Sequence, residues 1–197
     1  MSSSATNLRD LKKVENTHRI TVCAQRLTEA RGLDGFTMAD LAEAAEVSRR
    51  TLFNYFPGKV DAVLGAHPDI PEADLTRFRA GGPHGNLLDD VAELARVTIA
   101  VKQPDRDSLE LGLRVLRSEP RLLAAAHARF EAVIEDFAAL LVEREGPDFA
   151  ADQARLLLRL LLTLLDSALN IFVSQGPERS LVEVFDEQLA LARELFA

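Results

Sequence analysis

Glycine and proline residues divide the second half of the chain at regular intervals, and this punctuation constrains the fold more than any other feature. Gly146-Pro147 and Gly176-Pro177 each place a residue that favours helix ends before one that favours helix starts, and Pro104 and Pro120 mark further starts. The segments between them are rich in leucine and alanine, which suit helix better than strand. The sequence therefore predicts an all-α fold with helices at about 87–102, 105–117, 120–144, 148–174 and 178–196.

The N-terminal part of the chain is divided into shorter segments. We expect residues 1–7 to be disordered, as chain ends often are. Gly32 and Pro57-Gly58 end helical patterns, whereas Thr37 and Ser48 are good N-cap residues that begin them. The predicted helices are at about 8–31, 38–45 and 49–55, with a fourth that begins near Lys59.

The segment from Phe36 to Lys59 has the pattern of a helix-turn-helix motif. Small Ala42 allows two helices to cross closely, and Val47 fills the turn between them. We expect Leu41, Leu52 and Phe56 to face inward. The second helix then presents polar residues outward, namely Arg49, Arg50, Thr51, Asn54 and Tyr55. Arginine binds guanine edges, asparagine binds adenine, and threonine contacts the thymine methyl group, so this face is suited to DNA bases.

The charge of the chain is unevenly distributed. The net charge is −8, with 23 Lys and Arg against 31 Asp and Glu. Residues 1–65 carry nine basic and eight acidic residues, which gives +1, so residues 66–197 carry −9. We therefore expect a DNA-binding domain at 1–65 and a separate domain at 66–197, with any DNA contact made by the first.

Three stretches resemble the DNA-binding head of TetR-family transcriptional regulators: Gly35-Phe36-Thr37, Leu41-Ala42 through Val47-Ser48, and Thr51-Leu52-Phe53 through Lys59. The similarity covers about residues 15–65. It implies an N-terminal three-helix helix-turn-helix head followed by a C-terminal helical body that binds a ligand and dimerises. Two departures are Phe53, where many relatives have tyrosine, and an early helix break at His67-Pro68.

The resemblance also implies individual roles. By this resemblance, residues 49–55 are expected to form the recognition helix that binds in the DNA major groove. Phosphate contacts are expected from Thr37, Tyr55 and Lys59, and base contacts from Arg50, Thr51 and Asn54. The complete set of expected DNA-binding residues is Thr37, Ser48, Arg49, Arg50, Thr51, Asn54, Tyr55 and Lys59.

The two C-terminal helices are candidates for a dimer interface. The stretch Leu156–Val173 is leucine-rich, but Arg159 and Asp166 interrupt it, so we do not expect it to span a membrane. A helix that is apolar nearly all round is buried on two faces. We therefore expect a homodimer formed by the helices at about 148–174 and 178–196 of two subunits.

Polar residues on the first of these helices allow two interpretations. Arg159, Thr163, Asp166 and Asn170 follow one another at helical spacing and lie on one stripe. They form a polar seam in the dimer interface or an intrahelical network, or they line an apolar ligand pocket. In the second interpretation, Arg114 and His127 are candidate partners for an anionic group.

Several classes of function are not favoured by the sequence. The four histidines lack metal-ligand spacing, and no phosphate-binding glycine loop or nucleophile elbow is present, so we expect neither an enzyme nor a cofactor or metal. Cys23, the one cysteine, fits a core position better than a redox sensor, and a reducing cytoplasm is expected.

The resemblance to TetR-family regulators implies a ligand-responsive repressor that binds a palindromic operator as a homodimer and is released by a small, mostly apolar effector. One alternative is a DNA-binding regulator whose body serves only dimerisation or a protein partner. A helical enzyme or carrier is the other alternative.

Overall fold

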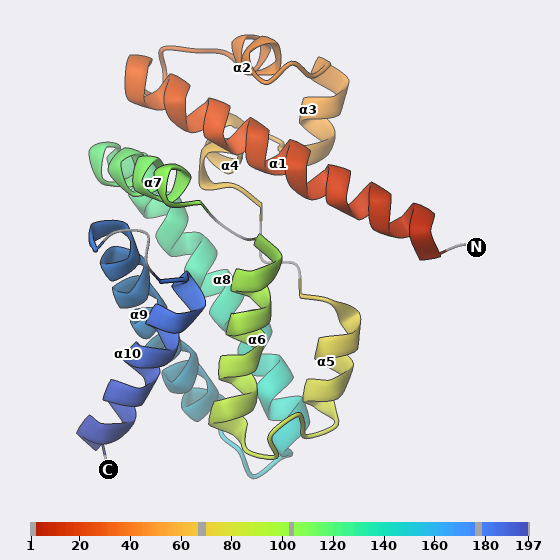
Figure 1. The fold of residues 1–197 in the computed structure, drawn as a ribbon, viewed down its shortest axis with the longest axis vertical. Helices are drawn as coiled ribbons and strands as arrows, with labels where there is room; N and C mark the ends of the chain where they lie inside the picture. Colours follow the sequence, from red (N-terminus) through yellow and green to blue (C-terminus); the bar gives the residue numbers. More distant parts are fainter. Residues whose placement is uncertain (1–2, 67–69, 103–104, 176–178, 197) are drawn as a thin grey trace. The chain divides into compact units, whose positions relative to one another are not determined.

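The structure is a computed structural model that describes residues 3–66, 70–102, 105–175 and 179–196. Within these ranges it contains ten helices and no strand, which confirms the all-α prediction (Figure 1). The chain divides into two compact units, Met1–His67 with Asp107–His127, and Pro68–Arg106 with Ala128–Ala197. The expected punctuation at His67-Pro68, Pro104 and Gly176-Pro177 lies outside the described residues.

The first unit combines the N-terminal helices with a segment from the middle of the chain. Its helices are α1 (Ser3–Arg31), α2 (Met38–Ala44), α3 (Arg49–Tyr55), α4 (Lys59–Leu64), nearly all of α7 (Arg106–Ser118), and the start of α8 (Pro120–Glu145). α7 therefore packs with the N-terminal helices, although it follows residue 65 in the sequence. Whether the DNA-binding function ends at residue 65 stays a prediction.

α1 begins earlier than the sequence pattern indicates. The helix starts at Ser3, so residues 3–7 are helical rather than disordered. The physical reason is that this stretch contains no glycine or proline, and adding a turn to an existing helix costs far less than nucleating a new one.

One hydrophobic core holds the first unit together. Ile20 of α1, Leu41 of α2 and Leu52 of α3 are fully buried in it, and Val115 of α7 is 1% exposed. Gln25, 9% exposed, donates from Nε2 to the Val63 backbone oxygen at 3.0 Å, which ties α1 to the end of α4. Gly112 of α7 lies against the same amide, because a β-carbon there would be 3.1 Å from Gln25 Nε2. The contact of α7 with α1 therefore depends on a residue without a side chain.

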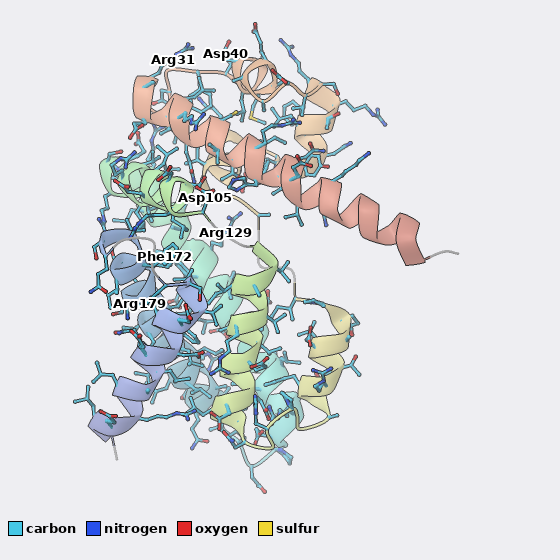
Figure 2. All side chains as sticks on the ribbon, viewed as in Figure 1. Arg31, Asp40, Asp105, Arg129, Phe172 and Arg179 are labelled. Carbon is cyan, nitrogen blue, oxygen red and sulfur yellow. The ribbon has the colours of Figure 1, made fainter. Side chains whose placement is uncertain are left out.

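The second unit contains α5 (Glu72–Arg79), α6 (Leu87–Lys102), the rest of α8, α9 (Ala151–Ser174) and α10 (Leu181–Phe196). α9 and α10 lie side by side (Figure 1). Arg106 stabilises the end of α9 by donating from Nε to the Val173 carbonyl at 3.0 Å and by stacking on the ring of Phe172, which Figure 2 labels.

A buried ion pair connects three helices of the second unit. Arg144 at the end of α8 binds Asp90 of α6, and both side chains are almost fully buried. The guanidinium group also lies over the ring of Phe78 of α5, 4.4 Å from its centroid, and Asp90 Oδ1 accepts a hydrogen bond from the His84 backbone at 2.6 Å. Removing one member of such a pair leaves the other as an uncompensated buried charge, which strongly destabilises the fold.

α9 is the one described helix that is long and apolar enough to cross a membrane by length and composition, with a mean hydropathy of 1.9. The core helix of a soluble protein passes the same test. Several of its large apolar side chains are exposed within this single chain, with Leu156 at 61% and Leu160 at 46%. α9 thus presents an apolar surface that its own subunit leaves uncovered.

Candidate nucleic-acid interface

Two side-chain caps define where the short helices of the first unit begin. The Thr37 hydroxyl accepts a hydrogen bond from the Asp40 backbone, and the Asp40 carboxylate accepts from the Thr37 backbone at 2.7 Å, so the two form a capping box before α2. The backbone and side-chain hydrogen bonds from Thr37 lower the pKa of the Asp40 carboxyl. Ser48 caps α3 by accepting from the Thr51 backbone at 3.0 Å, which confirms both predicted N-caps.

The turn between α2 and α3 is tight. Glu46 has φ 53°, in the left-handed region, and the Val47 backbone donates to the Ala42 carbonyl at 2.9 Å. Leu52 is fully buried and Phe56 is 2% exposed, so the inward face of α3 agrees with the helix-turn-helix prediction. This geometry fixes which side chains of α3 face outward.

The outward face of α3 lacks partners within the described part of the chain. Arg49, Arg50 and Asn54 are exposed, and none of them makes a hydrogen bond or ion pair with a described residue. Thr51 is half-buried, and its hydroxyl is 2.7 Å from the Ser48 hydroxyl. The face thus offers two guanidinium groups and one amide that are free to bind an external ligand.

Tyr55 is less exposed than the sequence pattern indicates. Its side chain is half-buried, and its hydroxyl accepts a hydrogen bond from Asn16 Nδ2 of α1 at 3.4 Å. The side-chain oxygen Oδ1 of Asn16 accepts in turn a hydrogen bond from the Arg19 guanidinium group at 2.9 Å. The sequence does not predict this contact of Asn16 with Tyr55, because the two residues are 39 positions apart and no local pattern connects them.

Lys59, an expected phosphate contact, has two partners inside the protein. Its Nζ donates to the Leu33 carbonyl at 2.7 Å and to the Phe36 carbonyl at 2.9 Å, and it lies 5.1 Å from the centroid of the Phe36 ring. The side chain therefore holds the loop between α1 and α2, directly before the Thr37 cap. An ammonium group has three N–H donors, so these two bonds leave one donor for a phosphate.

Comparison with known proteins agrees with this geometry. Residues 20–64, which span the helix-turn-helix, match the family of bacterial regulatory proteins named tetR. Residues 20–64 therefore form a DNA-binding domain of the TetR type. This family consists of DNA-binding regulators rather than enzymes, in agreement with the sequence analysis.

The chain also aligns with relatives of similar length over most of their sequences. The chain is 26% identical to a nucleoid occlusion factor SlmA of Alteromonas mediterranea, over 94% of this chain and 98% of that protein. It is 25% identical to SlmA of Haemophilus influenzae, over 90% of this chain and 84% of that one. A solved structure of a TetR-family transcriptional regulator from Mesorhizobium loti has the same fold, with a TM-score of 0.52, 21% identity and coverage of 92% and 95%.

The residues considered for ligand binding fall into separate groups. Arg159, Thr163 and Asp166 are exposed on one face of α9, and Asn170 is half-buried on the same face. Arg159 pairs with Glu131 at 2.7 Å, and the Thr163 and Asn170 side chains donate to backbone carbonyls of their own helix at 2.8 and 2.7 Å.

The other two candidates lie in the first unit. Arg114 pairs with Glu29 at 3.1 Å and Glu110 at 2.7 Å, and His127 is exposed on α8. Their function as ligand contacts stays a prediction.

Cys23 is partly exposed on α1. Its thiol donates to the Ala44 carbonyl, with Sγ and oxygen 3.4 Å apart, and burial raises the pKa of the thiol. Because the thiolate is the reactive form, this environment suppresses the reactivity of the cysteine.

Proposed function

We propose that this protein is a cytoplasmic, ligand-responsive repressor that binds a palindromic operator as a homodimer and leaves it when a small, mostly apolar effector binds. The outward face of α3 carries this proposal. Arg49, Arg50 and Asn54 are positioned by a buried helix face, yet none of them makes a hydrogen bond or ion pair with a described residue. Recognition helices of helix-turn-helix proteins contact base edges through such side chains.

The proposed DNA-binding surface contains the remaining members of the predicted set. Ser48, Thr51 and Thr37 have hydroxyl groups at helix N-termini, where phosphates are bound favourably. We assign base contacts to Arg50, Thr51 and Asn54, and phosphate contacts to Thr37, Tyr55 and Lys59. Ser48 and Arg49 complete the surface.

Dimerisation through α9 and α10 is supported by their uncovered apolar side chains. Leu156 and Leu160 of α9 and Leu191 and Leu195 of α10 are between 46% and 73% exposed in a single chain. Two helices from each of two subunits form a four-helix interface in many dimers. Leu156→Glu with Leu160→Glu should convert a dimer into a monomer in analytical ultracentrifugation. Leu123→Glu, which replaces an exposed leucine on α8, is the matched control.

The decisive experiment selects bound sequences from random DNA at a stated salt concentration, with Arg50→Ala in parallel. An enriched near-palindrome with half-sites ~34–36 Å apart, lost or blurred in the variant, supports the proposal. A folded dimer that enriches no sequence contradicts it.

Effector control needs a separate measurement. An effector can release DNA only if it binds the free state of the protein more tightly than the DNA-bound state. We would titrate hydrophobic drugs, fatty acyl thioesters and steroids against the labelled operator by fluorescence anisotropy. The ligand-responsive function is supported if one class of compound releases the operator and binds the free protein more tightly than the DNA-bound protein.

A second candidate is a DNA-binding protein that needs no small effector. It is favoured by the relatives named nucleoid occlusion factors, which align over nearly the whole chain. Mapping the bound sites in cells separates the two functions, because a regulator occupies a few promoters. A factor that acts on the nucleoid as a whole occupies sites spread over the chromosome.

A further inference from the structure

We propose that Phe53 determines part of the sequence specificity by packing against the 5-methyl group of a thymine in the major groove. This inference deepens the proposed function and rests on it. Phe53 stands where many TetR-family relatives have tyrosine.

The first observation is the exposure of this ring. Phe53 is 53% exposed, although large aromatic side chains are usually among the most buried residues. The buried face of α3 is already occupied, since Leu52 is fully buried and Phe56 is 2% exposed. A rotation of the helix that buried the ring would therefore expose one of these core residues.

The second observation is its position among the outward residues. Phe53 follows Arg50 by three residues and directly precedes Asn54, which follows Arg50 by four. Residues three and four apart are neighbours on a helix surface. The ring is thus a neighbour of Arg50, which makes no hydrogen bond or ion pair in the described part of the chain.

The chemistry of the ring selects its DNA partner. Phe53 has no hydroxyl, so it cannot donate a hydrogen bond to a phosphate as a tyrosine could. Among the groups that base pairs present in the major groove, the thymine methyl is the apolar one, and phenylalanine is a suitable contact for it. Burial of the ring against that methyl removes apolar surface of both molecules from water.

The test uses the operator obtained by selection and replaces each thymidine by deoxyuridine, which removes only the methyl group. For the wild-type protein, we expect one or two replacements per half-site to weaken binding about three- to fivefold, the value of one buried methyl group. In Phe53→Ala, the same replacements should have no further effect. Phe53→Leu, which keeps an apolar side chain, should retain part of the discrimination.

Two controls keep the result interpretable. Arg50→Ala should weaken binding but keep the full penalty for deoxyuridine at the Phe53 position. Circular dichroism and thermal unfolding of Phe53→Ala should match the wild type, because the ring is outside the core.

The possible failures are distinct. If wild-type protein enriches no DNA sequence, the proposed function fails and the assignment of Phe53 is overturned with it. If an operator is enriched but deoxyuridine has no effect, or has the same effect in Phe53→Ala, only the assignment of Phe53 is overturned.

Discussion

The outward faces of α3 and α9 both display arginine and amide side chains, but they differ in what those side chains bind. On α9, Arg159 pairs with Glu131, and Arg155 pairs with Glu135 through two hydrogen bonds of 2.8 Å. On α3, Arg49 and Arg50 have no such partner among the described residues. These two arginines of α9 are therefore paired within their own chain, whereas the two arginines of α3 are left to water or an external ligand.

This difference helps to separate surface polarity that maintains the fold from polarity that serves binding. Arginine residues are equally conspicuous in both stretches of the sequence. Their partners, however, lie 20 and 28 residues away for α9, which the sequence pattern does not indicate. Whether the α9 stripe contacts a ligand stays a prediction.

The largest expected effect tests the two sides of α3 against each other. Leu52→Ala removes a fully buried side chain and should lower the free energy of unfolding by ~2–5 kcal/mol. Asn54→Ala, on the outward face, should change it by less than about 0.5 kcal/mol. Chemical denaturation followed by circular dichroism measures both. Equal losses would mean that the outward face also maintains the fold.

The next prediction concerns binding alone. Arg50→Ala should weaken operator binding by ~1–3 kcal/mol and relax the preference at one base position. The free energy of unfolding should stay the same, because Arg50 has no partner in the described chain. Affinity measurements on the operator and its single-base variants test this. Unchanged affinity and specificity would remove Arg50 from the base-contacting set.

Lys59 is expected to serve both the fold and DNA binding. Lys59→Met removes two charge-assisted hydrogen bonds to the Leu33 and Phe36 carbonyls and should lower the free energy of unfolding by ~1–3 kcal/mol. If the third donor also binds a phosphate, the variant should weaken binding to all sequences and flatten the salt dependence. A lower stability with an unaltered salt slope would assign Lys59 to the loop between α1 and α2 alone.

A smaller effect is expected on α9. Glu131→Gln breaks the exposed pair with Arg159 and should change the stability of the subunit by ~0–1 kcal/mol. Unfolding in low and high salt checks this, because screening should reduce the difference between variant and wild type. A loss that is large and insensitive to salt would place this pair in a dry environment.

The smallest prediction is a pH dependence of the cap before α2. Since the folded state lowers the pKa of Asp40, the ionised carboxylate stabilises the fold above the ordinary pKa of aspartate, and this stabilisation disappears as the pH falls through the folded value. Asp40→Asn should therefore be less stable than wild type at pH 6, and the two should converge towards pH 3. Unfolding curves over this range provide the measurement, and a constant difference would exclude the carboxylate as the cause.

The features that sequence alone predicts here are local ones. Gly and Pro punctuation gives the helix boundaries, and Thr37 and Ser48 are recognisable as caps because the capping bond joins residues three apart. Helical periodicity likewise indicates that Leu52 faces inward and Arg50 outward. These signals lie within one or two helical turns, so no tertiary information is needed.

The features that the sequence does not predict are long-range. The hydrogen bonds of Tyr55 with Asn16 and of Lys59 with the Phe36 carbonyl join residues 39 and 23 positions apart. The presence of α7 in the first unit is another example, since the two segments of that unit end and resume 40 positions apart, at His67 and Asp107. Such contacts depend on how helices pack, and neither propensity nor periodicity carries that information.

The close approach of α7 to α1 has a mechanical consequence. At Gly112 the space beside the Gln25 amide is so small that even one added carbon would crowd it, and that amide also holds the Val63 carbonyl at the end of α4. Helices α1, α4 and α7 therefore meet at one side-chain amide, that of Gln25. A displacement of α7 towards α1 therefore has to move the side chain that also holds the end of α4.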